Sequence, residues 1–163
     1  MTYYHYTNLV RGFKILQDYK IIIGETEKRM AKKPACWFST NDHFEKSQYA
    51  GYENEEGRKF VFTPEEMSKL MGSVRFGFNK LNSFITFAKY KHASKEPIEL
   101  YESLIKYGEK VGADTKEWYA SFQDISLDYC ISIEIFIKDK WVEWSEENYY
   151  KAVKVAKMIQ LNN

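Results

Sequence analysis

The chain has 163 residues, with 24 Lys and Arg against 23 Asp and Glu and a formal net charge of +1. This length is enough to bury one ordinary hydrophobic core, and we expect a single domain over residues 1–163. The near-neutral charge disfavours a protein whose main task is non-specific binding of nucleic acid, but it leaves room for a local basic pocket for phosphate. Aromatic residues make up 17% of the chain, which suits both a core and a ring-stacking pocket.

Cysteine and histidine give no sign of a disulfide framework or a metal centre. Cys36 and Cys130 lie in apolar segments far apart in sequence, which favours two reduced, buried thiols in a cytoplasmic protein without a signal peptide. The histidines and cysteines show no ligand spacing, so we expect no metal. No apolar run approaches the roughly 20 residues that a membrane span requires.

The chain begins with a tyrosine-rich segment that contains a histidine. Read as a strand, Tyr3-Tyr4-His5-Tyr6-Thr7 places His5 and Thr7 on one face and Tyr4 and Tyr6 on the other. Two interpretations stay open. The segment is either an aromatic edge strand whose histidine binds a backbone carbonyl, or the first part of a binding site.

The first half of the chain predicts short elements. Thr63 and Pro64 are a strong helix start, because threonine caps a helix and proline suits its first position. A highly charged segment, 24–33, is expected to be a loop, as is 51–57, and Thr40 or Asn41 is expected to cap a short helix around Phe44. We expect helices from about residue 9 to 16 and 63 to 72, and strands over 3–7, 35–40, 59–62 and 73–78.

The second half contains the clearest helix and the clearest strand. Apolar residues at helical spacing after Pro97 predict a helix that ends at Gly112. Residues 129–137 alternate, with Tyr129 and four isoleucines on one face and Ser132 and Glu134 on the other. A hairpin partner over 141–144 and a terminal helix over 146–161 complete the chain. Short strands mixed with helices predict an α+β fold with a split or mixed antiparallel sheet, and no glycine-rich phosphate loop is present.

Polar side chains on several predicted strands suggest a common site. If these strands share a sheet, their polar faces converge on one cleft that offers a histidine, an arginine, hydroxyls, a carboxylate and an aromatic ring, as a nucleotide pocket requires. Each side chain also has a structural explanation: a solvent-facing carboxylate, a surface or ion-paired arginine, a core tryptophan, or a hydroxyl that ends a strand. The candidates are His5, Thr7, Trp37, Ser39, Arg75, Ser132 and Glu134.

The segments Tyr4-His5-Tyr6-Thr7 and Trp37-Phe38-Ser39-Thr40 resemble the opening of ADP-ribosyltransferase-like proteins, a superfamily that includes RNA 2′-phosphotransferases and DNA-modifying toxins. The resemblance implies the fold of that superfamily and NAD as cofactor. It also implies roles for particular residues. His5 and Thr7 would hold the nicotinamide-ribose part, and Glu134 would be the catalytic carboxylate, with His5 positioning the ribose. The cofactor-binding set is His5, Thr7, Trp37, Ser39 and Arg75, with Arg75 neutralising the pyrophosphate.

The chain is more similar still to a small group of bacterial and phage proteins with the same two segments and a following aromatic–Glu pair, here Phe44-Glu45, together with Arg75, Trp118 and Trp141. Two functions follow as hypotheses. The first is transfer of ADP-ribose from NAD to a protein, a nucleic acid or a nucleotide. The second is a non-catalytic nucleotide- or protein-binding module of phage or mobile-element type. Removal of an RNA 2′-phosphate ranks last, because it would need several arginines around one phosphate.

Overall fold

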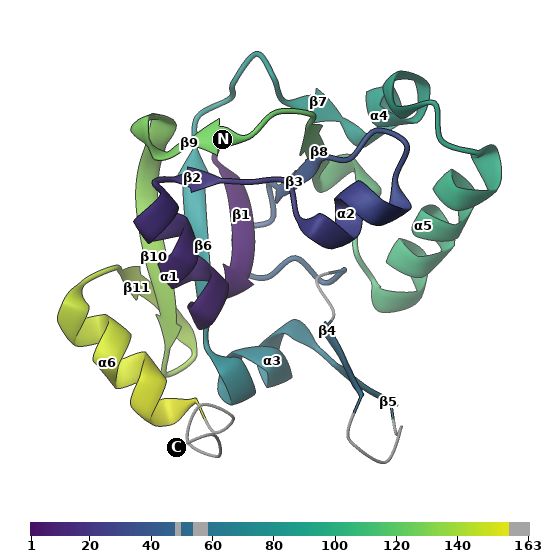
Figure 1. The fold of residues 1–163 in the computed structure, drawn as a ribbon. Coiled ribbons are helices and arrows are strands. Elements are labelled where there is room, and N and C mark those ends of the chain that lie inside the picture. The colour runs from purple at the N-terminus through teal and green to yellow at the C-terminus, as the bar shows by residue number, and fades with distance from the viewer. Residues whose placement is uncertain (48–49, 54–58, 157–163) are drawn as a thin grey trace.

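The computed structural model describes residues 1–47, 50–53 and 59–156. Its centre is a seven-stranded sheet in the order β11-β10-β6-β1-β3-β8-β7, in which every pairing is antiparallel (Figure 1). The strands are β1 (Tyr3–Asn8), β3 (Cys36–Ser39), β6 (Ser73–Phe78), β7 (Ile85–Thr86), β8 (Trp118–Ser121), β10 (Cys130–Ile137) and β11 (Lys140–Glu143). Two small antiparallel sheets pair β2 (Lys20–Ile21) with β9 (Ile125–Ser126) and β4 (Ala50–Glu53) with β5 (Lys59–Phe62).

Helices pack around this sheet, which makes the fold α+β, as expected from the sequence. In Figure 1, α1 lies in front of β1 and β6, α6 lies beside β10, and α4 and α5 lie at the opposite end near β7 and β8. The helices are α1 (Leu9–Asp18), α2 (Glu25–Met30), α3 (Pro64–Met71), α4 (Phe87–Ser94), α5 (Ile98–Val111) and α6 (Glu146–Val155), with single 3₁₀ turns over Thr115–Glu117 and Leu127–Tyr129. None of the helices in the described ranges is long and apolar enough to cross a membrane.

Local sequence signals explain where several helices begin. The Asn8 side chain accepts from the backbone N–H of Arg11 at 2.9 Å, so α1 starts directly at the end of β1. Thr63 and Glu66 form a reciprocal capping box at the start of α3. Because α1 follows β1 without a loop, its first turn is held beside the polar end of that strand.

The register of the sheet decides which side chains share a face. In β1, His5 pairs with Phe76 and Tyr6 pairs with Arg75. In β10, Glu134 also pairs with Arg75. Directly opposed residues of antiparallel strands point to the same face, so Glu134, Arg75 and Tyr6 share one face and His5 lies on the other.

The face that carries His5 also carries most of the core. Buried side chains from β1, β6 and β10 pack there against α1, β2 and α6. An added Cβ at Gly12 would lie 3.0 Å from the Val74 side chain, which shows how closely α1 approaches β6. The opposite face is covered in two parts, an aromatic cluster around Tyr6, Phe44 and Phe136 and a second one beneath α4 and α5.

The long strand differs from its expected pattern. We expected its isoleucine row to be continuous, but the register shifts between Cys130 and Ser132, which is the signature of a bulge. Tyr129 and Ile131 are consequently 59% and 54% exposed, whereas Ile135 is fully buried. The hairpin to β11 turns through residues 138 and 139, which both have positive φ as a type I′ turn requires.

Three further expectations differ from the structure. The charged segment 24–33 contains the short helix α2, and β4 covers residues 51–53 of the loop that was expected over 51–57. No helix forms around Phe44 within residues 41–47. The terminal helix ends at Val155, with Ala156 as its extended C-cap residue, and residues 157–161 of its expected range, like residues 54–57 of the expected loop, lie outside the described residues.

Candidate functional site

The two sides of β1 are paired very differently. Toward β6 the register contains six residue pairs, whereas toward β3 it contains only the pair Tyr4–Ser39. Beyond that pair the backbone ladder ends. The next hydrogen bond between the two strands comes from a side chain, since the Nδ1 atom of His5 lies 3.0 Å from the backbone carbonyl oxygen of Trp37. We call this interruption between β1 and β3 the split. It is the feature around which the candidate site is built.

The His5 ring is held in one protonation state by its surroundings. Burial lowers its pKa below the ordinary value of 6.5, more than its hydrogen bond to the Trp37 carbonyl raises it, and the nearby Arg11 charge lowers it further. A carbonyl oxygen only accepts, so the neutral imidazole carries its proton on Nδ1. Nε2 is then left as a hydrogen-bond acceptor.

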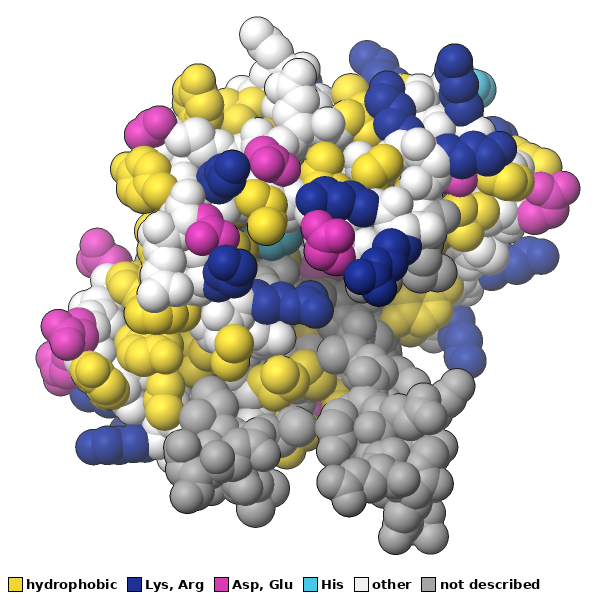
Figure 2. Space-filling model, viewed as in Figure 1, with side chains coloured by type: hydrophobic (Ala, Val, Ile, Leu, Met, Phe, Trp, Pro, Cys, Tyr) yellow, Lys and Arg dark blue, Asp and Glu magenta, His cyan; other side chains and the backbone are white. Residues whose placement is uncertain are grey.

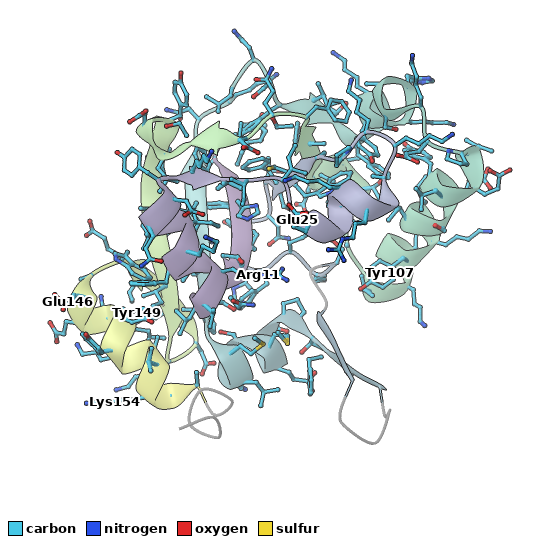
Figure 3. The ribbon with its side chains drawn as sticks, in the orientation of Figure 1. Arg11, Glu25, Tyr107, Glu146, Tyr149 and Lys154 are labelled. Atoms are coloured by element: carbon cyan, nitrogen blue, oxygen red, sulfur yellow. The ribbon has the colours of Figure 1, made fainter. Side chains whose placement is uncertain are left out.

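A cleft of about 780 Å³ opens on the His5 side of the split. We call it the polar cleft, because charged residues of α1 and α2 line its walls. Figure 2 shows this face hollowed where dark blue and magenta side chains gather, and Figure 3 shows Arg11 of α1 and Glu25 of α2 beside the space between the two helices. The lining includes His5, Thr7, Arg11, Lys14, Asp18, Glu25 and Glu27.

The charged groups of the polar cleft are not all neutralised. Asp18 is paired with Lys14 at 3.0 Å, and Glu25 is paired with Lys28 at 2.8 Å. Within the part of the chain that the structure describes, Arg11 and Glu27 have no ion-pair partner. The cleft therefore holds one uncommitted cation and one uncommitted carboxylate.

Glu27 also connects the cleft wall to the split. Burial raises the pKa of its carboxyl, the Trp37 side chain opposes that rise through a hydrogen bond, and the nearby Glu96 charge adds to it. Trp37 is thus linked on one side to His5, through its carbonyl, and on the other to Glu27, through its side chain. A ligand that enters the polar cleft would contact both His5 and Glu27.

A second, smaller space of about 270 Å³ lies on the other face of the split. We call it the aromatic cavity. Its walls come from β1, β3, β8, α4 and α5 and from the segment after β3. Its aromatic lining consists of Tyr4, Tyr6, Trp37, Phe87, Tyr107 and Trp118, together with Phe38 and His5 at the split itself.

One buried carboxylate, Glu45, lines the aromatic cavity. Its Oε2 accepts from the Ser39 hydroxyl at 2.5 Å, and its Oε1 accepts from the Trp118 indole at 2.9 Å. The backbone N–H and the hydroxyl of Ser47 also donate to Oε1, at 3.0 and 2.6 Å. Every partner is a donor, so the carboxylate needs no proton of its own to make these bonds.

Arg75 and Glu134 do not join His5, which corrects the expected convergence. Arg75 Nε donates to Glu134 Oε2 at 2.8 Å, and its guanidinium lies over the rings of Tyr4 and Trp141 at 4.2 and 4.5 Å. The guanidinium also donates to the Asp42 carbonyl. The strands do share a sheet, as expected, but alternation places this ion pair on the face opposite His5 and Thr7.

The remaining candidates fall at the split. Thr7 is buried beside His5 in the polar cleft, and Ser39 lines the aromatic cavity with its hydroxyl committed to Glu45. The Trp37 ring packs 4.7 Å from Tyr90, so it is partly a core residue as well as a wall of both spaces.

Three residues of these spaces were missed from the sequence: Arg11, Glu27 and Glu45. Arg11 had a usable signal, because a helix that starts directly after a strand keeps its first turn beside that strand. Glu27 lay in a segment expected to be a loop, and Glu45 was noted only as part of a motif.

Comparison with protein-family models, with curated proteins and with solved structures found no match. The described residues contain no group of three or more histidine, cysteine or acidic side chains placed to hold a metal ion.

Proposed function

We propose that the protein binds NAD in the polar cleft and belongs functionally with the ADP-ribosyltransferase-like proteins that its first strand resembles. The observation that carries this proposal is the position of His5. It sits at the split, on the edge of a large cleft, with its Nε2 left as an acceptor and with Thr7 on the same face. A ribose hydroxyl is a donor of the kind that such a nitrogen binds.

Charge in the cleft supports the phosphate part of the same ligand. Arg11 is exposed at the start of α1 and has no ion-pair partner among the described residues. A guanidinium is well suited to phosphate oxygens, because its planar donors bind two of them at once. In this proposal Arg11 takes the role that the sequence suggested for Arg75.

The catalytic carboxylate must also be reassigned within the proposal, since Glu134 is bonded to Arg75 on the other face. Glu27 is one candidate, because it lines the cleft and has no cation partner in the described chain. Glu117 is the other. Glu117 ends the 3₁₀ turn directly before β8, the strand that pairs with β3, and its carboxylate accepts from the uncharged Asn41 amide at 3.2 Å.

The experiment is NAD turnover by the wild-type protein and by three matched carboxylate variants, Glu27→Gln, Glu117→Gln and Glu134→Gln. Release of nicotinamide and labelling of candidate acceptors with ADP-ribose are measured alongside NAD affinity. We expect one of the first two variants to lose turnover by two orders of magnitude or more while it still binds NAD, because a positioned charge acts mainly on the transition state. Glu134→Gln serves as the control and should keep turnover.

Two results would count against the proposal. If the wild-type protein neither binds nor consumes NAD, the cleft serves another ligand. If folded Glu134→Gln alone loses turnover, the face opposite His5 carries the reaction. Tight NAD binding without turnover in every acceptor tested would instead identify a nucleotide-binding module without catalysis.

A further inference from the structure

The aromatic cavity contains one buried carboxylate, Glu45, which has no role in the proposed NAD site. Glu45 is buried and is the one charged side chain in the described lining, which otherwise consists of aromatic, aliphatic, serine and neutral histidine side chains. No described residue forms an ion pair with Glu45. Its four hydrogen bonds all come from uncharged donors of Ser39, Ser47 and Trp118.

Such a lining favours a positively charged ligand over a negatively charged one. A buried carboxylate that is solvated only by neutral donors leaves a net negative charge in the cavity wall. Aromatic rings add to this effect, because their faces are negative and attract cations, most strongly where water is excluded. An anion such as a phosphate would meet repulsion from Glu45 and find no lysine or arginine in the described lining.

We infer that the aromatic cavity binds a small organic cation, of the quaternary or alkylated ammonium class. Tyr4 and Tyr6 form one part of its aromatic lining, Trp37, Phe87 and Trp118, which belong to one packed cluster, form another, and Glu45 supplies the opposite charge. Tyr107 extends the wall from α5 and projects from the side of that helix that faces the body of the domain (Figure 3). The volume of about 270 Å³ limits the ligand to a small molecule or to the head of a larger one.

This inference does not rest on NAD. The polar cleft and the aromatic cavity share His5, Tyr6 and Trp37 as a common wall, but the argument for the cation depends on Glu45, which lines only the aromatic cavity, and not on Arg11 or Thr7, which line only the polar cleft. A protein that fails to bind NAD would still be expected to bind the cation. A protein that binds NAD but no simple cation would retain the first proposal and lose this one.

The test uses choline and its neutral isostere 3,3-dimethylbutan-1-ol, titrated into the ¹⁵N-labelled full-length protein. The indole N–H resonance of Trp118 reports on Glu45 directly through its hydrogen bond, and that of Trp37, whose side chain is bonded to Glu27, reports on the wall that the aromatic cavity shares with the polar cleft. Trp144 packs against the core near α6 and serves as an internal control. We expect choline to shift the two cavity resonances and to bind at least about tenfold more tightly than the neutral alcohol.

Equal affinity for the two probes, or no shift of the cavity resonances with either, would overturn the inference. The variant Glu45→Gln should abolish the preference for choline, whereas Glu96→Gln should preserve it. Glu96 is a matched control, because its carboxylate also accepts from backbone donors but lies outside the cavity. If Glu45→Gln fails to fold, Tyr107→Leu in the wall should weaken choline severalfold and leave the neutral alcohol nearly unchanged.

Discussion

Polar side chains on the two sides of β1 differ in whether they are bonded within the protein or remain available to a ligand. On the side of β6 the ladder is continuous, and Arg75 is closed in by Glu134, two aromatic rings and a backbone carbonyl. On the side of β3 the ladder ends after one residue pair, and polar groups beside the split remain able to bind a ligand. Among the described residues, the acceptor nitrogen of His5 has no hydrogen-bond partner and Arg11 has no ion-pair partner.

The comparison shows that the role of a polar residue on a strand, structural or ligand-binding, can be inferred only together with its neighbours across the sheet. Arg75 and Arg11 are both near β1 in space, but one completes a buried network and the other faces a cleft. A structural arginine should affect stability and leave ligand binding unchanged. A cleft arginine should do the reverse.

The largest expected effect is on the continuous side. Arg75→Ala removes the partner of Glu134, whose side chain is only 22% exposed, and it empties the space between two rings. We expect the free energy of unfolding to fall by about 3–5 kcal/mol, the usual cost of breaking a buried pair by removing one member. Urea denaturation followed by tryptophan fluorescence measures it. A loss below about 1 kcal/mol, the range of exposed pairs, would show that this network is not structural.

The next effect is a pH dependence that arises at the split. His5 takes up a proton near pH 6.5 when unfolded, but its pKa in the folded state is lower. The unfolded state therefore binds more protons below pH 6.5, and the free energy of unfolding must fall as the pH is lowered, by at most about 1.4 kcal/mol per pH unit. The measurement is urea denaturation between pH 5 and 8, with His5→Gln as the reference. An identical pH slope in the two proteins would contradict the burial of the imidazole.

A smaller effect concerns the ligand. His5→Ala removes the Nε2 acceptor, and we expect NAD affinity to drop about fivefold, or about 1 kcal/mol, as for one hydrogen bond. Calorimetric titration of NAD measures it. His43→Ala is the control, because His43 is exposed and outside both spaces. Equal affinities of wild type and His5→Ala would remove His5 from the proposed site.

The smallest effect on stability is expected for Arg11. Arg11→Ala changes an exposed side chain without an ion pair in the described chain, so the free energy of unfolding should change by no more than about 0.5 kcal/mol. NAD affinity should nevertheless fall, and its dependence on salt should weaken, because a phosphate contact is screened by ions. Titrations at low and high salt test this. A salt dependence unchanged by the substitution would place the pyrophosphate elsewhere.

Much of the local structure could be predicted, because it depends on neighbouring residues. The capping threonine and Pro64 predicted α3, alternation predicted β1 and β6, and the isoleucine row predicted most of β10. The bulge before Ser132 could not be predicted, because it depends on how β10 meets β6. Helix α2 was missed since its charged residues give no apolar face to recognise.

The candidate site was only partly predictable for the same reason. Alternation within each strand correctly separated His5 from Tyr4 and Arg75 from Phe76. It does not say which face of one strand aligns with which face of the next, since that depends on register. Pairing of His5 with Phe76 placed Arg75 and Glu134 behind the sheet, and no pattern within a single strand contains that information.

The most direct test of the split as the ligand site is an NMR titration with NAD that follows the histidine ring resonances. The chain has three histidines, and His43 and His92 are exposed and line neither space, so they serve as internal references. We predict that saturating NAD shifts the His5 resonances and leaves the other two in place. Binding of NAD with no change at His5 would contradict the account.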